Sequence, residues 1–171
     1  MRLSAFCLAL LVAFSGCGYT RKTTLPQNIQ SIYVRTVLNK IPVEEISTYQ
    51  PGLEMAITKA VIRRLNKDGN LKVVASENEA DVVLQSDLVR FQQEGLRFNN
   101  LERVEEYRLY LVLSLKLVST KTKELLWEEP NFSGDSEYFV SDVRSVGREE
   151  GVQRAVDRLA RNVVDRIVED W

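Results

Sequence analysis

Cys17 is the residue of this chain whose surroundings predict a defined chemical modification. Arg2 precedes an apolar run over residues 5–14, and the small pair Ser15-Gly16 comes directly before the cysteine. A basic start, a short apolar run and small residues at a cut site are typical of a secretory signal peptide, and the run is too short to span a bilayer. A cysteine directly after such a pair indicates a bacterial lipobox. There the thiol is acylated, residues 1–16 are removed, and the new amino terminus is acylated as well.

The predicted acylation makes Cys17 the lipidation site and a membrane anchor. Each buried methylene contributes about 0.8 kcal/mol, so several acyl chains together hold a protein on the bilayer. Phe14 departs from the leucine that is usual three positions before the cysteine. The alternative is a plain signal peptide cut near Gly16, with a cysteine there by coincidence.

Adjacent carboxylates are the other residues whose spacing raises the question of catalysis. A glycosidase needs two carboxylates that flank one bond, whereas neighbours on a strand point to opposite faces. The chain has no histidine, no glycine-rich phosphate loop and no cluster of metal ligands. We therefore expect no enzyme, no catalytic residues, no cofactor and no metal site. The carboxylate pairs are Glu44-Glu45, Glu105-Glu106, Glu128-Glu129 and Glu149-Glu150.

Basic residues remain as candidates for binding. Guanidinium groups grip phosphate with two parallel hydrogen bonds, so basic loops on a membrane-tethered domain suit a phosphorylated lipid. Taken singly, each is more simply an ordinary surface charge. The whole chain has 23 basic and 24 acidic residues, and loss of Arg2 with the signal peptide brings the net charge to −2, which favours no nucleic-acid partner. The candidates are Arg90, Arg97, Arg103, Arg108 and Lys116 along two central strands and their loop, and Arg144 and Arg148 before the last helix.

The elements that must position these residues follow from hydrophobic periodicity. Alternation predicts a strand near residues 32–36 and a long strand over 107–118, with a hairpin partner over 125–132. Residues 71–74 indicate a short strand, and the β-rich run 82–91, apolar on both faces, predicts a central or bulged strand. Apolar stripes at helical spacing predict a helix from Pro51, in its first turn, to Leu65, with a stop at Asp68-Gly69-Asn70, and a second over 152–167. Residues 39–50, 92–103 and 134–147 read as polar connections.

These elements predict a single folded domain behind a tether. We expect a signal peptide at 1–16, a lipidated tether at 17–30 and one domain at 31–171. Each helix has one apolar stripe, so both should pack on the same face of a mixed sheet of four to five strands, giving an α+β two-layer sandwich. The opposite face is amphipathic, with Tyr110 and Val112 beside Arg108. Such a face is usually solvated surface, but a protein that lies inside a larger partner also shows one.

Several stretches, taken in their order and spacing, resemble the LPS-assembly lipoprotein (LptE) family, the small subunits of the outer-membrane lipopolysaccharide translocon. They are Cys17-Gly18-Tyr19, Leu25-Pro26, Ile29 to Val34, Pro51-Gly52-Leu53 to Leu65, Ala80-Asp81-Val82-Val83-Leu84, Glu106-Tyr107-Arg108-Leu109, and Leu125-Leu126-Trp127 leading to Gly134. The resemblance covers essentially the whole mature chain.

The resemblance implies a location, a partner and a ligand. A family member is anchored by its cysteine on the periplasmic side of the outer membrane, plugs the large β-barrel LPS-assembly protein (LptD-like), and binds lipopolysaccharide. Basic residues before the longest strand and before the last helix are thought to touch lipopolysaccharide, and Arg97 and Arg144 occupy roughly those places. Arg108 and Lys116 are further candidates on the long strand.

A rival hypothesis keeps the anchor and the tether but changes the pathway. A lipoprotein that activates cell-wall synthases, or a secretin pilotin, would show the same features. The partner separates these hypotheses, because loss of the protein should reduce surface lipopolysaccharide only under the first.

Overall fold

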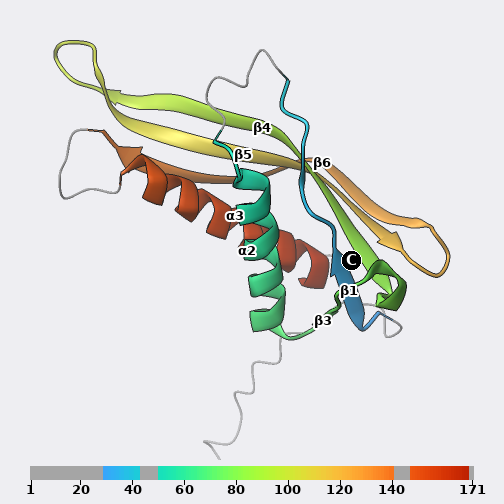
Figure 1. The fold of residues 1–171 in the computed structure, drawn as a ribbon. Coiled ribbons are helices and arrows are strands. Elements are labelled where there is room, and N and C mark those ends of the chain that lie inside the picture. Colours follow the sequence, from blue (N-terminus) through green and yellow to red (C-terminus); the bar gives the residue numbers. More distant parts are fainter. Residues whose placement is uncertain (1–28, 43–49, 141–146, 170–171) are drawn as a thin grey trace, which may run out of the picture.

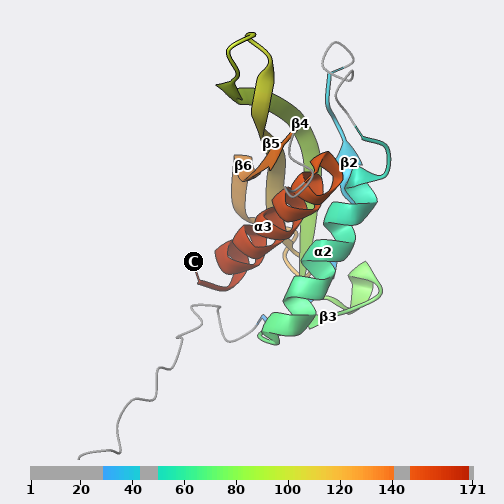
Figure 2. The ribbon, with the colours of Figure 1, turned by 90° about the vertical axis from the view of Figure 1, so that its left-hand side faces the viewer.

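The described residues form two layers, with both helices on one face of a mixed sheet (Figures 1 and 2). The computed structural model describes residues 29–42, 50–140 and 147–169. The predicted signal peptide, most of the tether, Cys17 and Arg144 lie outside these ranges. The elements are β1 (Ser31–Val34), β2 (Leu38–Asn39), α2 (Leu53–Asp68), β3 (Lys72–Val73), a 3₁₀ turn (Glu77–Glu79), β4 (Val82–Phe98), β5 (Val104–Ser119), β6 (Leu125–Phe139) and α3 (Arg148–Glu169).

The sheet confirms the predicted mixture of parallel and antiparallel pairs. Its order is β3-β1-β4-β5-β6, and β2 also pairs with β4. Strand β1 runs parallel to both β3 and β4, whereas β4, β5 and β6 are antiparallel. The sheet has six strands rather than four to five, because the two-residue β2 continues along β4 in the direction of β1 after a short break.

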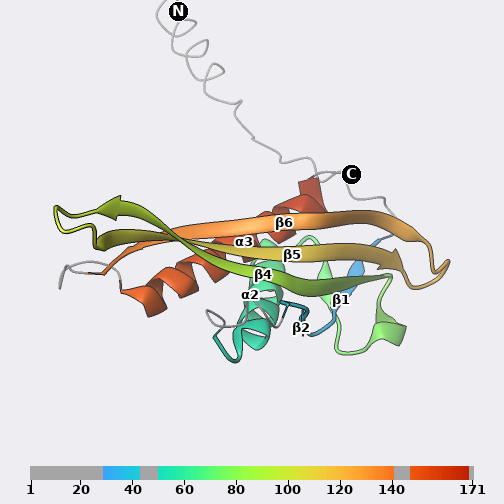
Figure 3. The same cartoon turned by 90° about the horizontal axis from the view of Figure 1, so that it is seen from above.

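Strands extend into two segments that the sequence predicts as loops. Strand β4 runs on to Phe98 and β5 begins at Val104, so the predicted loop at 92–103 shrinks to residues 99–103. Strand β6 likewise covers residues 134–139 of the second predicted loop. Both extensions pair with β5. The β4 extension has mostly polar side chains and projects beyond the helices (Figure 3), whereas the β6 extension packs against α3. Both extensions are held by backbone hydrogen bonds, and their sequences lack the apolar alternation from which a strand is predicted.

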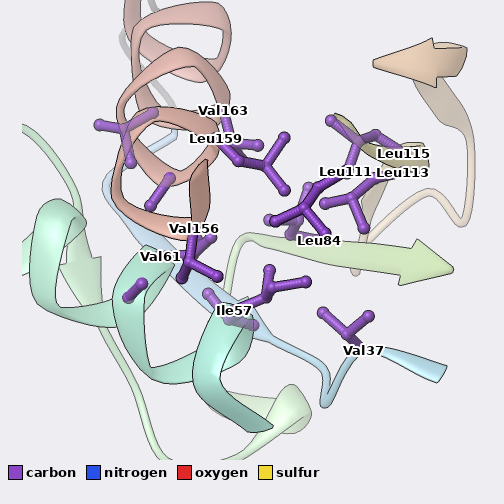
Figure 4. Packing of buried hydrophobic residues seen from close by; sticks show 14 of the residues in the cluster. Val37, Ile57, Val61, Leu84, Leu111, Leu113, Leu115, Val156, Leu159 and Val163 are labelled. Atoms are coloured by element: carbon purple, nitrogen blue, oxygen red, sulfur yellow. The ribbon is translucent and has the colours of Figure 1, made fainter. Parts of the chain in front are cut away.

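The core lies between the sheet and the two helices. Leucines at alternate positions of β5 from Leu109 to Leu117 are fully buried, which confirms the predicted alternation. Figure 4 shows Leu111, Leu113 and Leu115 pointing toward α2 and α3, where residues such as Ile57 and Leu159 face them. The helices therefore cover the face of the sheet that the leucine alternation of β5 predicts to be apolar.

Helix α2 ends where the sequence predicts and begins slightly later than expected. Gly69 has φ +79°, and its N–H donates to the Leu65 carbonyl at 3.0 Å, which closes the last turn. At the other end the helix starts at Leu53 after Gly52 at φ +87°, so Pro51 lies in the preceding turn rather than in the helix. A left-handed residue cannot belong to the helix, and it sets this boundary.

Helix α3 approaches β6 unusually closely at two glycines. A Cβ placed on Gly134 would lie 2.6 Å from Leu159 Cβ and 2.7 Å from its Cα. A Cβ on Gly151 of the helix would lie 2.9 Å from Tyr138 Cβ. The Ser136 hydroxyl, between these two contacts, donates to the Gly151 carbonyl at 2.5 Å. Because neither glycine has a side chain, the backbones of α3 and the edge strand β6 can pack directly against each other.

Replacing Gly134 with alanine is expected to destabilise the fold by roughly 1–3 kcal/mol, because the new methyl group meets helix backbone that cannot move aside. Urea unfolding followed by circular dichroism measures the change. Gly147→Ala is the matched control, since a Cβ there meets nothing within 4 Å. Equal stability of the two variants would contradict the close packing.

Asp81, which directly precedes β4, binds the start of β1 through hydrogen bonds. Its Oδ2 accepts hydrogen bonds from the Gln30 and Ser31 N–H groups, both at 3.1 Å, and from the Ser31 hydroxyl at 2.9 Å. Its Oδ1 accepts one from Lys121 Nζ at 2.7 Å. The bond from Lys121, followed by that from the Gln30 N–H, lowers the pKa of the Asp81 carboxyl to about 2. The carboxylate thus joins the residues just before β1 to the turn between β5 and β6.

Because the folded-state pKa of Asp81 is depressed, its stabilisation is present above its ordinary pKa and is lost as the pH falls from about 4 toward 2. Asp81→Asn is expected to lower the free energy of unfolding at pH 7 by about 2 kcal/mol and to flatten this acid dependence. Chemical unfolding at pH 7, 4 and 2.5 tests both effects. Glu124→Gln, in the exposed turn nearby, should change neither.

Candidate functional site

The candidate site is the outer face of the sheet, which no element of the described chain covers (Figure 3). The strand register sets its side chains in rows across β4, β5 and β6. One row is Glu94, Arg108 and Glu137; the next is Gln92, Tyr110 and Asp135; a distant one is Gln85, Lys116 and Glu128. The predicted amphipathic face is present, and its cations stand beside carboxylates.

Arg97 lies near the free end of the long β4–β5 hairpin. Its Nη2 is 3.3 Å from Glu106 Oε2, and its guanidinium lies 5.8 Å from the centre of the Phe139 ring. The Arg97 side chain is 62% exposed, whereas that of Glu106 is 11% exposed. Arg97 is therefore accessible to a ligand, and it also neutralises the nearly buried carboxylate of Glu106.

Arg108 is held more tightly than Arg97. Its Nε and Nη2 donate to Glu137 Oε1 at 3.1 and 2.5 Å, and its Nη1 approaches the Tyr110 hydroxyl at 3.5 Å. Tyr110 and then Glu137 raise the pKa of the Arg108 guanidinium above its ordinary value. Glu106 and Arg108 are two residues apart on one face of β5, about 7 Å, so the structure brings Arg97 and Arg108 close together.

Lys116 lies far from both arginines. Eight residues of strand, about 26 Å, separate it from Arg108. Its Nζ is 3.0 Å from Glu128 Oε1. The neighbouring Glu129 instead bonds Arg166 of α3 at 3.1 Å, so these adjacent carboxylates lie on opposite faces, as predicted. The candidate cations thus form one pair and one distant residue, and Arg144 is outside the described residues.

Lys116 also lines a pocket that sequence reasoning missed. The pocket is open, has a volume of about 290 Å³, and lies where the break between β1 and β2 faces β4 and β5. Arg35 begins this break and Lys40 follows β2, and their grouping with Lys116 depends on a chain path that periodicity does not give. The lining residues are Arg35, Thr36, Leu38, Lys40, Gln85, Ser86, Asp87, Ser114 and Lys116.

Exposed apolar side chains gather at the free end of the hairpin. Of the seven large hydrophobic residues that are exposed in the described ranges, four lie here. Leu101 is 73% exposed, and Phe98 and Val140 are each 58% exposed. Leu96 completes this apolar end, which consists of Leu96, Phe98, Leu101 and Val140.

Other kinds of site find little support in the parts of the chain that the structure describes. No group of three or more metal-ligating side chains converges there. Neither described helix combines the length and the apolar character that a membrane span requires. The outer face and the apolar end are therefore the features that a function must explain.

Comparison with known proteins places this fold. A family model described as LptE, lipopolysaccharide-assembly, matches residues 29–171. The comparison with curated proteins gave no significant match. Three solved structures share the fold at low identity, with TM-scores of 0.53 to 0.57.

The first of these structures is an uncharacterised lipoprotein B from Nitrosomonas europaea, with 13% identity, a TM-score of 0.53, and coverage of 89% of this chain and 92% of its own. A protein from Xanthomonas campestris has 14% identity, a TM-score of 0.57 and coverage of 86% and 90%. The PelC dodecamer from Paraburkholderia phytofirmans has 11% identity, a TM-score of 0.54 and coverage of 86% and 95%. At these identities the likeness concerns the fold alone. The family match spans most of the chain, and the chain therefore belongs to the LptE family of lipopolysaccharide-assembly proteins.

Proposed function

We propose that this protein is an outer-membrane lipoprotein that is anchored through acylated Cys17, plugs a large β-barrel partner and assists lipopolysaccharide transport. The family match supports the pathway. The proposal of a barrel partner rests on the apolar end, because exposed apolar clusters on a folded domain mark interaction surfaces.

The position of the apolar end also supports a protein partner. Strand β4 starts beside β1, where the tether enters, and its 17 residues span about 55 Å to the free end. The apolar end therefore reaches far from the proposed anchor. Residues 94–106 carry four glutamates and two arginines, so their net charge does not favour an anionic membrane surface.

The outer face of the sheet fits the lumen of a large barrel. Such a lumen is polar, and a domain that fills it needs a polar surface without unbalanced charge. The paired cations and carboxylates of the outer face meet that requirement. The family match favours this role over an interaction module of cell-wall synthesis or a secretin pathway.

Co-purification tests the barrel partner directly. A tagged full-length chain, extracted in detergent from its native membrane, should retain one large outer-membrane barrel through size exclusion. Recovery without any barrel contradicts the proposal, and recovery of a cell-wall synthase or a secretin instead points to the rival pathways.

Lipopolysaccharide binding is the second part of the proposal, with Arg97, Arg108, Arg144 and Lys116 as its contacts. An exposed ion pair is worth about 0–1 kcal/mol, so a doubly charged phosphate can displace a carboxylate from such a cation at small cost. The pairs of Arg108 with Glu137 and of Lys116 with Glu128, whose side chains are all partly exposed, then act as exchangeable partners that keep the face neutral until a ligand arrives.

Arg97→Ala is expected to weaken lipopolysaccharide binding and also to lower stability by about 1–3 kcal/mol, because Glu106 loses its partner while nearly buried. The double variant Arg97→Ala with Glu106→Gln separates these effects. Its stability should return toward that of the parent, while the weakened binding persists. Restored binding in the double variant would assign Arg97 a structural role alone.

A further inference from the structure

The pocket beside Lys116 has features that neither the barrel contact nor the arginine pair explains. It exists because the first strand is interrupted. Between β1 and β2 the Val37 N–H leaves the sheet and donates to the Thr58 hydroxyl of α2 at 3.0 Å. Pairing with β4 resumes at β2, and the Lys40 N–H donates to the Leu88 carbonyl at 2.8 Å. The detour toward α2 leaves a hollow on the outer face.

Three cations line this hollow: Arg35 directly after β1, Lys40 directly after β2, and Lys116 of β5. Lys40 has no ion pair among the described residues. Arg35 contacts Glu77 through Nε at 3.2 Å and Nη2 at 2.8 Å, and its Nη1 has no partner within the described ranges. Lys116 adds a third ammonium group, paired with Glu128 at 3.0 Å. The pocket therefore contains enough positive charge to hold a doubly charged anion.

The rest of the lining is suited to hydroxyl groups. Gln85 and Ser114 offer both donors and acceptors. Asp87 is an acceptor that opposes a bare anion, but it can receive a hydrogen bond from a hydroxyl on the same ligand. A volume of about 290 Å³ lies just below the ~300–1,000 Å³ that is usual for pockets of drug-sized ligands, so the pocket suits a small ligand.

We infer that this pocket binds a phosphorylated sugar, with the phosphate against Lys40, Arg35 and Lys116 and a sugar hydroxyl against Asp87. The inference rests on the proposed function only in that lipopolysaccharide is one source of such a group. A free sugar phosphate is the other source. The site lies at the opposite end of the outer face from Arg97 and does not require the barrel.

Calorimetric titration of the full-length protein in detergent tests the site with three probes: glucose 1-phosphate, inorganic phosphate and glucose. Glucose 1-phosphate should bind most tightly, and glucose alone should show no measurable heat. Lys40→Gln is expected to weaken glucose 1-phosphate binding about tenfold, the loss of one charge-assisted contact. Asp87→Asn should narrow the preference for glucose 1-phosphate over inorganic phosphate.

The control variant is Lys59→Gln, which removes an exposed lysine from α2 and should change nothing. Equal binding by Lys40→Gln, Lys59→Gln and the parent overturns the site, as does absence of binding. Competition by lipopolysaccharide against glucose 1-phosphate assigns the phosphate to the lipid headgroup, and lack of competition assigns it to a free sugar phosphate. Binding that survives while no barrel co-purifies retains the site and rejects the proposed partner.

Discussion

Replacing Cys17 with alanine is expected to yield a protein without acyl chains that keeps residues 1–16. In the lipobox reading the cut follows acylation of the thiol, so removal of the sulfur blocks both steps. Intact-mass spectrometry of the purified product reports both acylation and cleavage. The variant should have the mass of the uncut chain without acyl groups. Incorporation of labelled palmitate should fall to background.

Cys7 provides the matched control for this experiment. It lies inside the predicted signal peptide, so Cys7→Ala should leave the acylated mature product unchanged. An unmodified amino terminus at Cys17 in the parent protein would reject the lipid anchor and leave a plain secreted domain.

The second large effect is expected at the apolar end. Phe98→Asp combined with Leu101→Asp should reduce recovery of the barrel partner by tenfold or more, because each apolar anchor at the centre of an interface contributes about 2 kcal/mol or more. Both side chains are exposed, so the free energy of unfolding should change little. Quantitative co-purification at equal expression measures the loss.

Leu125→Asp is the comparison for this variant. Leu125 is 50% exposed and lies at the start of β6, away from the apolar end. It should leave barrel recovery intact. If the double variant and Leu125→Asp reduce barrel recovery equally, the apolar end is not the docking surface and general solubility explains the result.

Much of the fold was predictable because apolar spacing and turn chemistry act locally. The stripes of α2 and α3, the stop at Gly69 and the alternation of β5 are all confirmed. The ends of β4 and β6 were not predictable, since Gln92 and Glu94 pair through backbone groups and face solvent. Strand β2 is a two-residue pairing that only the neighbouring β4 defines.

The site was less accessible to sequence reasoning than the fold. Which carboxylate faces which cation depends on the strand register, and β4 changes register between Leu88 and Arg90 and again around Arg97. A register shift of one residue would move every side chain of the strand to the opposite face of the sheet. The pocket depends in turn on the hydrogen bond from the Val37 N–H to Thr58, which joins distant parts of the chain.

The attachment of β1 has a mechanical consequence. The tether enters at the amino end of β1, an interior strand, while the apolar end lies beyond the opposite end of the parallel strand β4. A pull between a membrane and a docked partner therefore loads the β1–β4 hydrogen bonds lengthwise, in shear, so they must break together rather than one after another. With the anchor and partner proposed above, this arrangement would resist tension along the long axis of the domain, and the hydrogen bonds of Asp81 to Gln30 and Ser31 would be the first to bear the load.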